Sequence, residues 1–240
     1  MAIHYDRRLR ARSPDPTLPM GTMKRQDDTA STREADPKTA RSRGADKRER
    51  ILDAALRVFA DRGFYNAKVS EVARAAGVAD GTIYLYFKNK DDLLIQLFED
   101  RMDFLIQRLQ EELARVGGSV VSRIRRLILL HLQIGATWPE LAEFITVELR
   151  QSSKFVKEYD NPKFSAYLRV LRDLVEEGQR DGSLKAGIDA RLVVRAMFGA
   201  LDEMLLTVTL MGRTREVDVD AMADMTADLL LGGITEPSAP

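Results

Sequence analysis

The sequence predicts an all-α protein made of a three-helix N-terminal head and a larger C-terminal helical body, with about nine helices in all. Three observations support this fold class. Apolar residues recur three and four positions apart through most of the chain from residue 46 onward, as they do on one face of a helix. No strand-like alternation of useful length is present. The 45% of apolar residues in a chain of 240 is enough for a sizeable core.

Composition and residue order restrict the kind of protein this can be. The chain has no cysteine, so it can form no disulfide. Its first residues carry several arginines without a following apolar run, unlike a cleavable signal peptide. The best candidate for a membrane span, residues 196–211, is interrupted by Asp202 and Glu203. We therefore expect a soluble, cytoplasmic protein with no membrane partner.

Residues 1–45 are predicted to form a disordered tail. They contain four prolines and few apolar residues, and most of the rest are small polar or charged types. Met20 and Met23 lie inside this segment, so the sequence leaves open whether Met1, Met20 or Met23 is the true start.

The first helix of the head is expected from about Asp46 to Arg62. Gly63 lies just past its end, where glycine commonly stops a helix. Its apolar stripe supplies the surface for the next two helices and consists of Ile51, Ala54, Ala55, Val58 and Phe59.

Two short helices with a tight turn between them are predicted from residue 66 to residue 90. Gly77 stands where a helix favours a residue tolerant of positive φ, and Asp80 is predicted to be the N-cap of the second helix. Ile83 and Phe87, four apart, are expected to dock inward. This arrangement is a helix-turn-helix, whose second helix enters the major groove of DNA. The alternative is an ordinary helical hairpin within a bundle.

The outward residues of this segment suit a phosphate backbone. Tyrosines beside lysines make a poor solvated face and a good phosphate-binding one. At the start of the first short helix, an ammonium and a hydroxyl can meet a phosphate together with free backbone amides. The predicted DNA-binding residues are Lys68, Ser70, Asp80, Gly81, Thr82, Tyr84, Tyr86, Lys88 and Lys90.

The stretch GVADGTIYLYFKNKDDLL, residues 77–94, resembles the DNA-binding signature of the TetR family of bacterial one-component repressors. The resemblance implies a homodimer that binds palindromic double-stranded operator DNA with its head and a small-molecule effector with its body. It also implies that Lys68 and Ser70 lie at a helix end that clamps a phosphate.

A second stretch, TVELRQSSKFVKEYDNPKF at residues 146–164, narrows the resemblance. Together with the first, it is similar to the TetR-type fatty-acid-degradation regulators, FadR-like proteins that release DNA on binding long-chain acyl-CoA. The resemblance covers roughly residues 46–232, and the tail before residue 46 departs from it.

Charge is distributed unevenly along the chain. Residues 1–90 carry 19 Lys and Arg against 12 Asp and Glu, and residues 91–240 carry the opposite surplus, because the whole chain has 37 of each. A basic head on an acidic body suits DNA binding, although a solvated imbalance explains the same numbers. Arg41 and Arg43 at the end of the tail fit a basic arm along DNA and a solubilising tail equally well.

A long helix is predicted from Asp91 to about Val116, with Asn89 as its cap and two glycines after it. This helix would couple the body to the head. The predicted organisation is a tail at 1–45, a DNA-binding domain at 46–92, an effector-binding and dimerisation domain at 93–233, and a flexible C-terminus at 234–240. Body helices are expected near 119–136, 139–153, 162–180, 189–211 and 216–231.

Enzyme chemistry finds little support. His131 is alone on an apolar helix, without the cysteine or carboxylate neighbours that a metal site requires. No nucleophile has a base beside it, and the paired glycines lack the phosphate-loop pattern. We therefore expect no catalytic residue, no metal site and no cofactor.

The body offers apolar helices with basic residues near their ends, and helical bundles can hold ligands between helices. Most of these apolar residues form core, and a fraction is expected to line an effector cavity. The candidate effector residues are Arg123, Arg126, Leu130, Ile134, Trp138, Phe144, Val147, Arg150, Phe164, Tyr167 and Leu171.

The helix predicted at 189–211 is apolar around most of its circumference, more than one chain can bury, so together with the last helix it predicts a two-fold dimer interface. The sequence therefore predicts a homodimeric, ligand-responsive repressor that controls fatty-acid degradation genes. Two alternatives stay open: a repressor that answers to another apolar molecule such as a drug, and a helical enzyme or scaffold without a DNA role. The operator, the target genes and the effector cannot be identified from the sequence.

Overall fold

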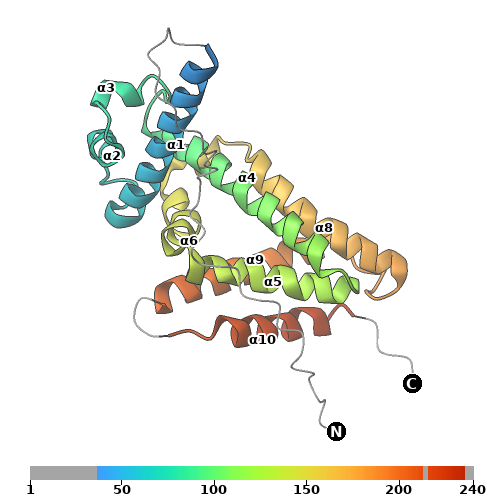
Figure 1. Ribbon diagram of the computed structural model, residues 1–240. Coiled ribbons are helices and arrows are strands. Elements are labelled where there is room, and N and C mark those ends of the chain that lie inside the picture. Colours follow the sequence, from blue (N-terminus) through green and yellow to red (C-terminus); the bar gives the residue numbers. More distant parts are fainter. Residues whose placement is uncertain (1–36, 213–215, 236–240) are drawn as a thin grey trace. The chain divides into compact units, whose positions relative to one another are not determined.

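The computed structural model describes residues 37–212 and 216–235, and it confirms the all-α fold. Its described regular structure consists of ten α-helices and one 3₁₀-helix, η1 (Figure 1). The chain divides into two compact units, residues 1–49 and residues 50–240. The second unit contains most of the predicted head together with the predicted body.

Helix α1 (Pro37–Arg62) begins nine residues earlier than the predicted start at Asp46. A proline has no amide hydrogen to donate, and the first turn of a helix requires none, so Pro37 can open a helix that it would break elsewhere. Residues 37–45 of the predicted tail are therefore helical. Residues 1–36 lie outside the described part of the chain.

Helix α2 (Val69–Ala76) and the turn after it form as predicted. Gly77 adopts the left-handed conformation at φ 65°, and the Val78 N–H donates to the Ala73 carbonyl at 3.0 Å, which closes the helix end. The Arg50 guanidinium donates to the Ala76 carbonyl at 2.6 Å. A cation thus stabilises the negative end of α2.

Helix α3 (Asp80–Ile83) is shorter than predicted and has a different cap. The N-cap is Ala79, whereas Asp80 is the first helical residue and makes no capping bond, so the predicted cap at Asp80 is wrong. After Ile83 the chain continues in tight turns, with the Phe87 N–H donating to the Ile83 carbonyl at 3.0 Å. These turns still bury Ile83 and Phe87, each 1% exposed, as predicted.

The long helix α4 (Lys90–Val116) confirms the predicted bounds within a residue. Asn89 caps it, since its side chain accepts a bond from the Asp92 N–H at 2.9 Å. Four body helices also agree with prediction to within three residues at either end: α5 (Val120–Thr137), α8 (Pro162–Asp181), α9 (Ala190–Met211) and α10 (Val219–Gly232).

The single helix predicted at 139–153 is wrong. The structure has α6 (Pro139–Thr146), η1 (Glu148–Gln151) and α7 (Ser153–Lys157) in its place. The break has a local cause, because Ser152 caps α7 by accepting a bond from the Phe155 N–H at 3.2 Å. It also has a distant cause, because the Glu148 carboxylate accepts the Phe64 N–H at 2.5 Å.

Helix α5 is central to the body. It packs against α4, α6, α8, α9 and α10, and Figure 1 shows α9 and α10 beside it. Gly135 allows a close approach of α5 and α9, because a Cβ atom there would lie 2.8 Å from a methyl carbon of Val208 on α9. A side chain at this position would force the two helices apart.

Among the described residues, no helix is both long enough and apolar enough to cross a lipid bilayer.

Candidate nucleic-acid interface and effector cavity

The predicted DNA-binding residues lie at the start of α2, on α3, in the turn after it and, for Lys90, at the start of α4. Tyr84 is 59% exposed, Lys88 is also exposed, and Thr82 and Tyr86 are half-buried. Asp80 and Gly81 are exposed as well. The structure therefore leaves this surface open to a partner.

The start of α2 is organised by Glu71. Its carboxylate accepts the backbone N–H of Lys68 at 2.9 Å, which satisfies a donor that the helix itself cannot pair. The Lys68 side chain is exposed and that of Ser70 is half-buried. The ammonium of Lys68 thus stands at the positive end of a helix, a favourable place for an anion.

Lys90 differs from the other predicted residues because its ammonium group is already hydrogen-bonded to the protein backbone. Its ammonium donates to the carbonyls of Phe64, Tyr65 and Ala67 at 2.7, 3.1 and 3.1 Å. It also lies 4.6 Å from the centroid of the Phe64 ring. An ammonium has three donors, and all three are engaged, so a phosphate contact would require one of these bonds to be exchanged.

A cavity of about 180 Å³ lies among α4, α5, α6, η1, α7, α8 and α9. Four of the predicted effector residues line it: Ile134, Arg150, Phe164 and Tyr167. Its other lining residues are Phe98, Met102, Leu105, His131, Ile145, Leu149, Phe155, Asn161, Phe198, Asp202 and Leu205.

Aromatic rings form much of the cavity wall. Phe98 meets Phe155 edge-on at 5.0 Å between ring centroids, and Phe164 meets Phe198 in the same way at 4.7 Å. Phe155, Phe164 and Phe198 are only partly buried. This wall therefore presents ring surface to an apolar ligand rather than to other core residues alone.

Deep in the cavity wall, His131 Nδ1 and the Tyr167 hydroxyl are 2.6 Å apart. Burial lowers the pKa of His131 to about 4, with the Leu201 carbonyl opposing the shift, and burial also raises the pKa of Tyr167. Both side chains are therefore neutral near pH 7. The pair adds one hydrogen bond, and no charge, to the apolar interior.

The charged lining residues are Arg150 on η1 and Asp202 on α9, and they form an ion pair through Arg150 Nη2 and Asp202 Oδ2. The Arg150 side chain is 54% exposed and that of Asp202 is 22% exposed. By contrast, Met102, Leu105, Leu149 and Leu205 are buried. The ion pair therefore marks the mouth of the cavity.

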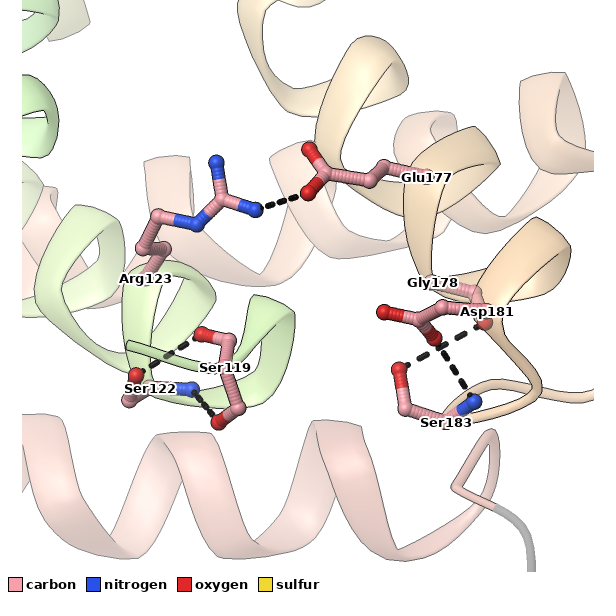
Figure 2. Close-up of polar contacts among 7 residues, drawn as sticks. All are labelled: Ser119, Ser122, Arg123, Glu177, Gly178, Asp181 and Ser183. Carbon is pink, nitrogen blue, oxygen red and sulfur yellow. Dashed lines mark hydrogen bonds and ion pairs between the residues drawn. The ribbon is translucent and has the colours of Figure 1, made fainter. Parts of the chain in front are cut away.

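The other seven predicted effector residues do not line this cavity. Arg123 pairs with Glu177, and Figure 2 shows it extending from the start of α5 toward the end of α8. It precedes His131 by eight residues, about 12 Å along the helix. Arg126 pairs with Glu112 at 2.9 Å. The remaining five are Leu130, Trp138, Phe144, Val147 and Leu171, of which Phe144 and Leu171 are fully buried core.

The segment from η1 to Ser152 contacts both the cavity and the head. Leu149 and Arg150 line the cavity. On either side of them, the buried Glu148 accepts the Phe64 N–H, and the buried Ser152 donates to Asp91 at 2.9 Å. Adjacent residues of this segment therefore link the cavity wall to the turn after α1 and to the start of α4.

Two family models match consecutive parts of this chain. Residues 51–97 match the model of the bacterial regulatory proteins of the tetR family, and residues 98–233 match that of the YsiA-like protein C-terminal region. The fatty acid metabolism regulator protein of Bacillus subtilis is 36% identical over 184 residues, which cover 77% of this chain and 93% of that one. The chain belongs to the TetR family.

Two solved structures are similar to this TetR-family protein. One is the transcriptional regulator FadR from Bacillus subtilis in complex with stearoyl-CoA, with 36% identity and a TM-score of 0.71. The other is the fatty acid degradation regulator FadR from Bacillus halodurans, with 35% identity and a TM-score of 0.70. Each alignment covers 77% of this chain and 98% of the other. The TetR-family protein is thus a transcriptional regulator with a helix-turn-helix, rather than an enzyme.

Two exposed residues of the TetR-type head were not singled out from its sequence. Leu85 is 80% exposed between Tyr84 and Tyr86, and Tyr65 is 70% exposed before α2. The sequence does indicate that Leu85 is exposed, since it stands between two tyrosines that point outward and cannot face the core. Tyr65 gave no comparable signal, because it lies in a turn without periodicity.

Proposed function

We propose that this TetR-family protein is a cytoplasmic, homodimeric repressor of fatty-acid degradation genes, and that long-chain acyl-CoA releases it from a palindromic operator. The observation that carries the proposal is the aromatic and aliphatic cavity with a guanidinium at its mouth. A relative of 36% identity has been solved with stearoyl-CoA. Each methylene that the ligand buries contributes about 0.8 kcal/mol at best, so the apolar lining favours an acyl chain over a polar ligand.

The coenzyme A part requires cations outside the cavity, because its phosphates stay charged. Arg150 is more than half exposed at the mouth. Lys154 and Lys157 lie on α7, the short helix that also contributes Phe155 to the lining. We expect the two lysines to meet the phosphates, in place of the ion-paired Arg123 and Arg126, while Arg150 stays at the mouth in its ion pair with Asp202.

On the DNA side, we expect Lys68, Ser70, Tyr84 and Lys88 to contact phosphates, and Thr82 with the exposed start of α3 to face the bases. Lys90 has a different role in this proposal. Its three bonds fix the loop that leads into α2, so it positions Lys68 and Ser70.

Release requires that the effector favour a conformation whose head is wrongly placed for DNA. The predicted lever is α4, and η1 adds a second connection. An acyl chain that displaces Leu149 or Arg150 would pull on Glu148 and Ser152, which hold Phe64 and Asp91. Both contacts end on residues that flank the helix-turn-helix.

Dimerisation is proposed through the outer faces of α9 and α10. Four large apolar side chains there are exposed, at 66, 51, 66 and 79% for Leu192, Leu210, Met225 and Leu229. Val208 is buried beside Gly135, so a charge at that position would test the core rather than an interface. Leu229→Glu should instead give folded monomers with weakened operator binding, as light scattering and circular dichroism would show.

The proposed function is tested by fluorescence anisotropy of labelled DNA from upstream of the gene. Palmitoyl-CoA at micromolar concentration should release the bound protein, and palmitate at the same concentration should release much less. DNA binding that persists in palmitoyl-CoA would exclude a lipid effector and leave a TetR-type repressor that responds to another ligand. Absence of any sequence-specific binding would remove the repressor role itself.

A further inference from the structure

The ion pair at the cavity mouth has an unusual environment on the α9 side. Asp202 stands in the middle of a helix whose inward face is apolar, including Met197, Leu201 and Leu205, each no more than 2% exposed. Its carboxylate lines the cavity and is bonded to Arg150. A fixed negative charge therefore lies where the polar end of an acyl ligand would rest.

We propose that Asp202, through its ion pair with Arg150, makes the cavity selective for neutral acyl thioesters over free fatty acids. This inference rests on the proposed function and adds the residue that decides which form of the fatty acyl group is bound.

The selectivity follows from what each ligand needs at the mouth. A fatty acid that buries its chain brings a carboxylate to Arg150, the only cation among the described residues that line the cavity. That guanidinium already forms an ion pair with Asp202. The carboxylates of Asp202 and of the fatty acid would therefore share one positive charge at close range. Like charges in a partly buried site repel strongly, and the free acid must protonate, displace Asp202 or stay in water.

A thioester avoids this conflict. Its carbonyl oxygen is neutral and accepts a hydrogen bond without adding charge, and a guanidinium has five donors, so Arg150 can bind Asp202 and the carbonyl together. Asp202 then acts as a positioning residue, because it holds the Arg150 donors at the mouth. The charged phosphates lie farther out, beyond the acyl carbon.

The inner wall of the cavity offers a carboxylate nothing better. His131 is the one ionisable base in the inner wall, and burial keeps its pKa near 4. It is neutral at pH 7 and cannot offset the charge of a fatty acid that enters with its carboxylate first. The like-charge conflict at the mouth therefore has no alternative site within the lining.

The test measures dissociation constants for palmitoyl-CoA and palmitate by calorimetry, below their micelle-forming concentrations, with full-length wild type, Asp202→Asn and Asp160→Asn. The Asp160 variant is a matched control: it makes the same change at an exposed acid beside Asn161, which lines the mouth. In Asp202→Asn the ratio of the palmitate constant to the palmitoyl-CoA constant should fall about tenfold or more, because Arg150 becomes free for the ligand carboxylate. In Asp160→Asn it should stay within about twofold of wild type, since exposed charges are screened.

Two outcomes would overturn the inference while the proposed function stands: wild type that binds palmitate as tightly as palmitoyl-CoA, or an unchanged ratio in a folded Asp202→Asn protein that still binds palmitoyl-CoA. An equal fall in both variants would assign the effect to general charge and also overturn it. Failure of wild type to bind palmitoyl-CoA at all would instead reject the proposed function.

Discussion

The helix-turn-helix and the candidate effector cavity are built in different ways. Around the helix-turn-helix, charged side chains tie the backbone together: Lys90 bonds three carbonyls and Arg50 bonds the end of α2. The large residues beneath, such as Phe59 and Phe87, are no more than 1% exposed. Around the cavity, Phe155, Phe164 and Phe198 are partly buried and surround unfilled space.

This difference indicates which region can change its packing when a ligand binds. A close-packed region with satisfied hydrogen bonds moves as a unit, because its parts have no alternative low-energy packing. Rings beside a cavity can repack at small cost. The head is therefore expected to be repositioned as a whole by changes that begin in the cavity wall.

The largest expected effect comes from truncating one ring in each region. Phe87→Ala should destabilise the protein by about 3–5 kcal/mol, the usual cost of a cavity in a close-packed core. Phe155→Ala should cost about 1 kcal/mol or less, because its ring is partly exposed beside existing space. Urea denaturation measures both, and similar losses would show that the two regions are equally packed.

The next largest effect is expected at Lys90, whose ammonium bonds three backbone carbonyls of the head. Lys90→Met should cost about 2–3 kcal/mol, because it leaves three carbonyls without their charged donor. Lys88→Met is the control, since this exposed lysine is two residues away and should change stability by at most about 0.5 kcal/mol. Equal effects in the same denaturation assay would mean that the Lys90 bonds add little.

The pH dependence of stability should report on the cavity wall. His131 has a pKa near 4 when folded and near 6.5 when unfolded, so the unfolded chain binds more protons between these values. The contribution of neutral His131 to the free energy of unfolding is fully present above pH 6.5 and is lost as the pH falls toward 4. Between pH 7 and pH 5 the loss should be about 2 kcal/mol. His131→Gln should flatten this part of the curve, and an unchanged slope in the variant would assign the effect to other groups.

The smallest effect tests the connection between the regions. Glu148→Gln keeps the shape but weakens the charged bond to the Phe64 N–H, so the factor by which palmitoyl-CoA weakens DNA binding should fall about five- to tenfold. Affinity for palmitoyl-CoA alone should change little. Glu140→Gln, at an exposed position on α6, is the control. An undiminished factor in Glu148→Gln would exclude the Glu148–Phe64 bond and leave the coupling to α4 and the Ser152–Asp91 bond.

The helices could be predicted because their signals are local. Apolar spacing, Gly77 in the left-handed conformation and the Asn89 cap depend only on neighbouring residues. The break at Val147 could not be predicted in the same way, because it depends partly on Glu148 reaching a backbone amide 84 positions away. Local propensity alone favours one continuous helix through that segment.

The outward residues of the helix-turn-helix were also predictable, because one short segment supplies them all. The cavity was predictable only in part, since seven elements contribute its lining. An acid within an apolar helix was the available signal for Asp202. The partners of Arg123 and Arg126 depend on packing between helices, which spacing along one helix does not reveal.

The central claim is that the cavity and the DNA-binding surface are coupled, and reciprocal titration tests it most directly. Palmitoyl-CoA is titrated into the protein by calorimetry with and without saturating operator DNA. Linkage requires that the operator weaken ligand binding by the same factor by which the ligand weakens operator binding, which we expect to be about tenfold or more. Equal ligand affinity in the presence and absence of operator would contradict the account, even if palmitoyl-CoA binds tightly.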